Sequence, residues 1–133
     1  GRERRGTSVG RHSRSERSDL TAARRARARW GEERAAEWYA RNGYEIIARN
    51  WFMRGGELDV VARRGKLIVV CEVKSRANSN FGTPLEAMTT TKQHRVRRAG
   101  YAFVRELAEQ GCSLRFDVAT VLGTQLTVYE DAF

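Results

Sequence analysis

The sequence predicts an α/β protein in which a mixed β-sheet is flanked by helices. Segments with helical spacing and segments rich in β-branched and aromatic residues follow in the order α-β-β-β-α-β-β. The third β segment is apolar on both alternating faces, which is typical of a central strand covered on both sides. The length of 133 residues has room for one domain. The alternative is an α+β layer in which all strands are antiparallel.

The N-terminal region combines a basic arm with a helix. In residues 1–19 the only large apolar side chain is Val9, so burial cannot offset the entropy of ordering and we expect a disordered basic tail. Residues 20–42 place Ala, Trp and Tyr at helical spacing, and Asn42 followed by Gly is a stop signal. Residues 20–133 are therefore expected to form a single folded domain.

Three strands are expected after this helix. Residues 44–53 are rich in β-branched and aromatic side chains and end before a pair of glycines. Residues 57–62 and 67–75 flank a turn that contains Gly, which predicts a β-hairpin.

The register of this hairpin decides how its charged residues are arranged. A turn of even length, made of residues 64–65 or 63–66, places position 59 opposite position 70 and puts Asp59 on the same face as Glu72. A turn of odd length sends the two carboxylates to opposite faces.

The rest of the chain is expected to form a loop, a short turn, a second helix and two paired strands. These elements correspond to residues 76–83, residues 84–88, a helix capped by Thr90 or Thr91 that runs to about Gln110, and residues 113–122 and 125–130.

Composition limits the classes of partner and location. The net charge is +9, and residues 1–30 alone carry +7, which favours an anionic partner such as DNA. No run approaches the ~18–20 apolar residues of a membrane span, so no membrane partner is expected. Cys71 and Cys112 fit neither a disulfide framework nor a four-ligand zinc pattern, which predicts free thiols and a cytoplasmic location.

The hairpin carries the residues with catalytic chemistry. Glu72 and Lys74 are two apart, so they project from one face of a strand. One interpretation is a structural salt bridge between Lys74 and Glu72 or Asp59 at a strand end. The other is a Mg²⁺ or Mn²⁺ ion held by Asp59, Glu72 and a backbone carbonyl, with Lys74 beside the attacking water.

A set of ordered strings links the chain to a known family. The strings are GEERA at 31–35, NGY at 42–44, ARNW at 48–51, GGELDVVA at 55–62, VVCEVKSR at 69–76, FGTPLEAM at 81–88 and RFDVA at 115–119. Together they resemble the YraN-like family of uncharacterised proteins. That family is assigned to the restriction-endonuclease-like superfamily with the PD-(D/E)xK signature, and it is similar in layout to archaeal Holliday-junction resolvases.

The resemblance implies a restriction-endonuclease-like α-β-β-β-α-β core and a set of site residues. The metal-binding Asp of the superfamily corresponds to Asp59, and the (D/E)xK triplet corresponds to Glu72, Val73 and Lys74. Glu32 is the position that matches the acidic residue of the first helix. Glu57 lies two residues before Asp59 on the same side of the strand.

Basic residues near this site are candidates for DNA contacts. They are Arg49, Arg54 and Arg76 on loops or strand ends, and Lys92, Arg95 and Arg98 on the polar side of the second long helix. The leading hypothesis is a metal-dependent nuclease that hydrolyses phosphodiesters of DNA, including branched or flapped DNA. The alternatives are a non-catalytic nucleic-acid-binding or repair module and a protein-binding accessory factor. A resolvase-like activity needs two sites and hence a homodimer.

Overall fold

The structure is a computed structural model that describes the backbone of residues 2–76 and 88–133, and side chains from residue 16 onward within these ranges. Its elements are α1 (Arg2–Arg41), β1 (Glu45–Met53), β2 (Gly56–Arg64), β3 (Leu67–Arg76), α3 (Thr90–Leu107), β4 (Ser113–Leu122) and β5 (Gln125–Tyr129). The predicted order of helices and strands is confirmed. Most of the loop and turn expected at residues 76–88 lies outside the described residues.

The five strands form one mixed sheet in the order β1-β2-β3-β4-β5. β3 and β4 are parallel, whereas each of the other neighbouring pairs is antiparallel. Parallel neighbours need a crossover connection, and α3 lies in the segment that joins β3 to β4. This pairing confirms the mixed sheet and excludes the all-antiparallel alternative.

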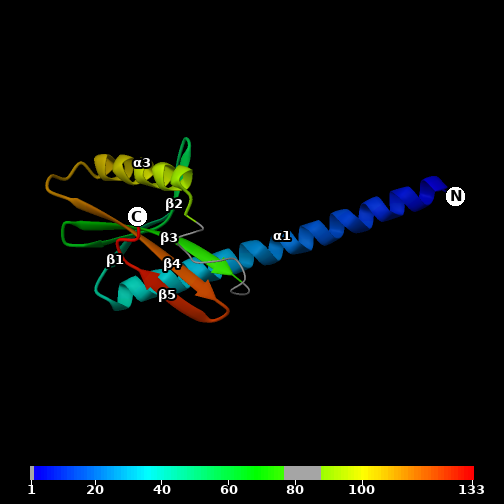
Figure 1. The fold of residues 1–133 in the computed structure, drawn as a ribbon, viewed down its shortest axis with the longest axis horizontal. Coiled ribbons are helices and arrows are strands. Elements are labelled where there is room, and N and C mark those ends of the chain that lie inside the picture. The colour runs from blue at the N-terminus through cyan, green and yellow to red at the C-terminus, as the bar shows by residue number, and fades with distance from the viewer. Residues whose placement is uncertain (1, 77–87) are drawn as a thin grey trace.

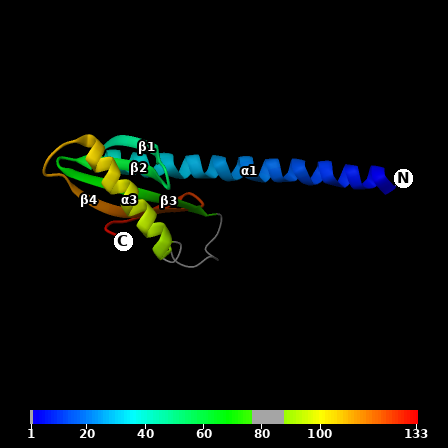
Figure 2. The same ribbon diagram turned by 90° about the horizontal axis from the view of Figure 1, so that it is seen from above.

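The two helices cover opposite faces of the sheet (Figures 1 and 2). On the α1 face, Ala35 and Tyr39 pack against strand residues such as Val69. On the α3 face, Phe103 packs in a cluster that includes Val70, together with other apolar side chains. Each buried Val, Leu or Phe side chain contributes about 1.5–3 kcal/mol, so these two layers hold both helices against the sheet.

Helix α1 is longer than the sequence predicts. The expected start is near Leu20, but the helix extends back to Arg2 and projects beyond the sheet (Figure 1). Residues 16–30 are exposed, so this part of the helix continues an already packed helix without packing of its own. None of the helices within the described ranges is both long and apolar enough to cross a membrane.

Helix α3 differs from its predicted bounds at both ends. Thr89 is the N-cap instead of Thr90 or Thr91, and its Oγ1 accepts a hydrogen bond from the Lys92 backbone N at 3.2 Å. The helix ends at Leu107, earlier than expected, because Ala108 takes a left-handed conformation with φ 54°. A glycine at position 100 lets this helix lie close to the sheet, since a Cβ there would lie 2.8 Å from the Phe116 ring.

Candidate active site

The β2–β3 hairpin places the two predicted carboxylates on one face. Its turn consists of Gly65 and Lys66, and Arg64 pairs with Leu67. The predicted even-length turn and the shared face of Asp59 and Glu72 are confirmed, because both side chains line one cavity. The predicted register is wrong by two residues, because Val60 lies opposite Cys71 and not opposite Val69. The turn starts one residue later than expected, since Gly65 supplies the positive φ of 61° that a tight hairpin turn needs.

The site lies where β2 and β3 separate. Their pairing runs only as far as Val60 opposite Cys71. Beyond this pair, the backbone N of Val73 donates a hydrogen bond of 2.9 Å to Oδ2 of Asp59. The Asp59 side chain thus takes the place of a backbone partner, which fixes the carboxylate and leaves Oδ1 available for a ligand.

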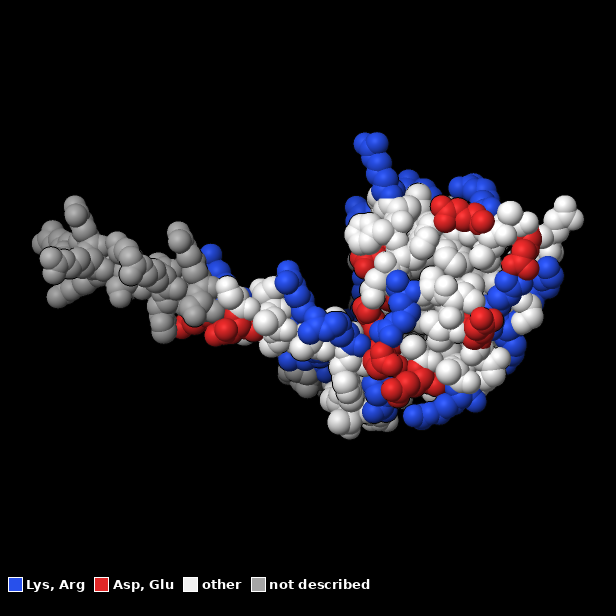
Figure 3. Space-filling model, turned by 180° about the vertical axis from the view of Figure 1, so that it is seen from behind, with Lys and Arg blue, Asp and Glu red and all other residues white. Residues whose placement is uncertain are grey.

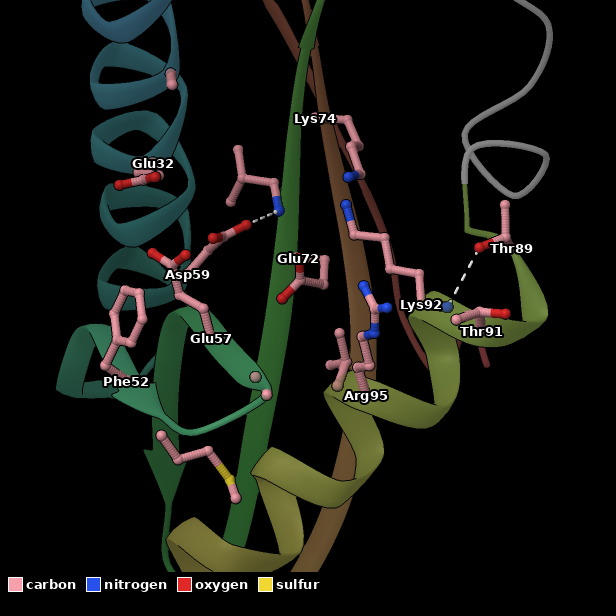
Figure 4. A pocket seen from close by; sticks show the side chains of 16 residues that line it. Glu32, Phe52, Glu57, Asp59, Glu72, Lys74, Thr89, Thr91, Lys92 and Arg95 are labelled. Carbon is pink, nitrogen blue, oxygen red and sulfur yellow. Dashed lines mark hydrogen bonds between the residues drawn. The ribbon is translucent and has the colours of Figure 1, made fainter.

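A cavity of about 780 Å³ opens beside this separation, and it has two walls of opposite charge (Figure 4). The acidic wall consists of Glu32, Glu57, Asp59 and Glu72. The basic wall consists of Lys74, Lys92 and Arg95, and the ends of the two lysine side chains point toward one another in Figure 4. Carboxylates and cations that line one cavity suit a ligand that carries both a metal ion and an anion, as a metal-bound phosphate does.

Glu72 is the buried centre of the cavity. Its residue is 4% exposed, and its Oε1 has no hydrogen-bond partner. Burial raises the pKa of this carboxyl well above its usual value, and the neighbouring Asp59 raises it further, while Lys92 and Lys74 oppose the shift. An unpartnered buried carboxylate oxygen is rare in folded proteins, which makes Glu72 Oε1 a candidate cation ligand.

Lys74 shares the cavity without closing an ion pair. Burial and the adjacent Lys92 lower the pKa of Lys74, whereas Glu72 and Asp59 oppose this effect. The ion pairs within the described residues lie elsewhere, for example between Arg49 and Glu33. Lys74 therefore faces the cavity with its amino group available to a bound molecule.

Helix α1 contributes Glu32 to the acidic wall, as the resemblance implied. Burial raises the pKa of Glu32, the Asn50 side chain opposes this by hydrogen bonding, and the charge of Asp59 raises it again. The helix can approach β3 this closely because position 31 is glycine, where a Cβ would overlap Ser75 Oγ.

The carboxylates of the acidic wall are suitable ligands for a hard cation, but in this structure they are not arranged around one ion position. Carboxylate oxygens suit Mg²⁺ or Mn²⁺ better than zinc. Within the part of the chain that the structure describes, no three Asp, Glu, His or Cys side chains form a cluster that could hold an ion as they stand. Asp59 and Glu72 are the pair best placed to bind one, with Glu32 next to them.

The basic residues predicted from the sequence separate into two groups. Lys92 and Arg95 line the cavity. Four others lie outside the described cavity lining: Arg49, which pairs with Glu33 at 2.7 Å, Arg54 between β1 and β2, Arg76 at the end of β3, and Arg98, which approaches Gly55.

One polar centre was not predicted. Asp117 is fully buried on the α1 face and accepts hydrogen bonds from Tyr39 Oη at 2.6 Å, Arg115 Nε at 2.9 Å and the Asp131 backbone N at 2.9 Å. These bonds join α1, β4 and the C-terminal turn, which indicates a structural role. The signal in the sequence is an acidic residue in the middle of an otherwise apolar strand.

Comparison with known proteins places this site in a family. The model of the uncharacterised protein family UPF0102 matches residues 31–121. The chain belongs to this family. A UPF0102 protein of Nocardia farcinica is 46% identical over 94 residues, which cover 71% of this chain and 74% of the relative. A UPF0102 protein of Acidothermus cellulolyticus is 44% identical over 111 residues, which cover 76% and 84%. The UPF0102 match includes both walls of the cavity except for the part of α1 before Gly31.

Proposed function

We propose that this UPF0102 protein is a metal-dependent nuclease that hydrolyses phosphodiester bonds of DNA, with branched and flapped DNA among the candidate substrates. The observation that carries the proposal is the single cavity in which Asp59 and Glu72 face Lys74, Lys92 and Arg95. The resemblance to the restriction-endonuclease-like superfamily and to Holliday-junction resolvases supports it, because its signature residues correspond to Asp59, Glu72 and Lys74.

Asp59 and Glu72 would hold the ion through Asp59 Oδ1 and the unpartnered Glu72 Oε1, and Glu32 is the third acidic group nearby. When bound, Mg²⁺ or Mn²⁺ polarises the phosphoryl group and lowers the pKa of a coordinated water. The neutral or charged amino group of Lys74 hydrogen-bonds the attacking water and keeps it directed at phosphorus.

The reaction is a hydrolysis in which water oxygen forms a bond to phosphorus and the bond from phosphorus to the leaving oxygen breaks. A proton from the water ends on the leaving oxygen, so the products are a phosphomonoester and a free hydroxyl group. Lys92 and Arg95 bind the non-bridging oxygens, where negative charge increases during the reaction. In this mechanism Asp59, Glu72 and Lys74 are the catalytic residues.

The second candidate is a nucleic-acid-binding module without catalysis. The observation in its favour is that the described side chains form no preassembled metal cluster. In that account, the basic wall binds phosphate and the acidic wall serves only as its counter-charge.

A cleavage assay tests the proposal. The protein is incubated with duplex, single-stranded, flap and four-way DNA, and we expect cleavage of at least one form only when Mg²⁺ or Mn²⁺ is added. Lys74→Ala should abolish cleavage, whereas Lys66→Ala, which changes an exposed lysine on the hairpin turn, should not. Binding of DNA with no cleavage of any form by the wild type favours the binding module.

A further inference from the structure

One face of α1 changes from buried and apolar to exposed and basic where the helix leaves the sheet. Tyr39, Ala35 and Gly31 are buried and follow one another at helical spacing along the face that packs on the sheet. Steps of three or four residues from Gly31 toward the N-terminus lead to Ala28 and Arg27, and the next turn leads to Arg24; all three are exposed. The face that is apolar over the sheet therefore becomes basic beyond it.

This basic face adjoins the active-site cavity. A second cavity of about 130 Å³ is lined by Arg24, Arg27, Ala28, Glu32, Val73 and Ser75. It shares Ala28, Glu32 and Val73 with the larger cavity, so the two cavities are neighbours. Ser75 Oγ, a buried hydroxyl oxygen without a hydrogen-bond partner, belongs to its lining.

The two arginines of the second cavity share its described lining with one acidic residue, Glu32. Among the described residues, neither Arg24 nor Arg27 forms an ion pair. From Thr21 to Trp30 the helix has four Arg and no acidic residue. Figure 3 shows basic side chains, all of them Arg, along the part of the projecting helix that adjoins the body. Unpaired cations beside a phosphate-sized cavity are complementary to an anion that lies outside the active site.

We propose that Arg24 and Arg27 bind the backbone phosphates that flank the scissile phosphodiester of the DNA substrate. This inference rests on the proposed function, because it places the reacting phosphate in the larger cavity and its neighbours along α1. DNA fits better than an acidic protein, since a polynucleotide presents regularly repeated anions that extend from one cavity into the next. The arginines position the strand and read no sequence.

The test measures binding of a fluorescent flap DNA by anisotropy, without divalent metal, over a range of salt concentrations. The variant Arg24→Ala/Arg27→Ala is compared with Arg25→Ala/Arg29→Ala, which removes the same charge from the same stretch of helix but from another face. Alanine favours helix, so both variants should fold. We expect the first variant to weaken binding at least about tenfold and to lower the salt slope by about two, and the second to change each much less.

Equal losses in the two variants, or no loss in either, would overturn the inference, as would a wild type that does not bind DNA. The outcome is separable from that of the nuclease proposal. A wild type that binds through Arg24 and Arg27 but never cleaves removes the enzyme and keeps this contact. A wild type that cleaves while both double variants bind alike keeps the enzyme and removes the contact.

Discussion

Glu72 combines deep burial with a carboxylate oxygen that lacks a partner. In metal-free protein its charge is unfavourable, because burial and Asp59 both penalise the ionised form. The same group becomes favourable when a cation binds beside it. Unfolding experiments on the metal-free protein can therefore measure how much this carboxylate lowers the free energy of unfolding.

We predict that Glu72→Gln stabilises the metal-free protein by about 1–3 kcal/mol, since the amide keeps the shape and removes the charge. Burial raises the pKa of Glu72 from 4.5 to about 8. The folded wild type thus holds a proton that the unfolded chain releases, and its stability falls as pH rises through this window. Urea unfolding should show little difference between the two proteins below about pH 4.5 and a growing difference toward pH 8. Glu106→Gln, an exposed control, should change stability by less than about 0.5 kcal/mol.

The two cysteines should differ in reactivity. Cys71 is fully buried in β3 and burial raises the pKa of its thiol, whereas Cys112 is partly exposed. Because the thiolate is the reactive form, mass spectrometry after brief alkylation should find the native protein modified at Cys112 alone. Alkylation of both sites in the native state would contradict this burial. Denatured protein, modified at both, is the control.

The sequence did not predict which basic side chains of α3 line the cavity. Lys92 and Arg95 were expected on the same polar side of α3 as Arg98. Only the first two line the cavity, whereas Arg98, almost one turn further along α3, lies near Gly55. The shared face of the proposed catalytic residues of the hairpin was predictable, since alternation along a strand fixes it.

At the scale of elements, hydrophobic spacing predicted each described strand and both helices, whereas their ends and register depended on local backbone geometry. The hairpin turn moved by one residue to place Gly65 at a positive φ, and a left-handed Ala108 ended α3 early. The lack of apolar residues before Leu20 did not predict the extension of α1, because a helix can continue where nothing packs on it.

The close contact between α1 and β3 gives a prediction at this scale. Gly31→Ala should lower the free energy of unfolding by about 1–3 kcal/mol, because its Cβ would overlap Ser75 Oγ and push the helix away from the strand. Adding Ser75→Ala removes the overlapping atom and should restore part of this loss in a double-mutant cycle. Strictly additive effects on the denaturant midpoint would show that the two residues are not in contact.

At the scale of the whole molecule, positive charge is concentrated at one end. Residues 1–30 carry +7 of the net +9. From Arg2 onward they belong to α1, the helix that contributes Ala28 and Glu32 to the candidate active-site cavity. This distribution favours a long polyanion bound along α1 and across the end of β3. The homodimer that a resolvase-like reaction requires, and the cytoplasmic location, stay predictions.

Deletion of residues 1–19 should leave the fold intact, because both apolar layers of the sheet are formed by later residues. Affinity for DNA should fall and its salt dependence should flatten, since fewer counterions are released on binding. Circular dichroism checks the fold, and anisotropy over a salt series checks binding. Unchanged affinity and salt slope would mean that this basic arm takes no part in DNA binding.

The measurement that tests the central claim most directly is a calorimetric titration of the metal-free protein with Mn²⁺. We predict one ion bound per chain, with affinity weakened at least about tenfold by Asp59→Asn or Glu72→Gln because each removes a charged oxygen ligand. Lys74→Ala should still bind the ion, and Glu106→Gln should bind it as the wild type does. A wild type that binds no Mn²⁺, or binding that survives loss of both carboxylates, would contradict a metal-dependent site at Asp59 and Glu72.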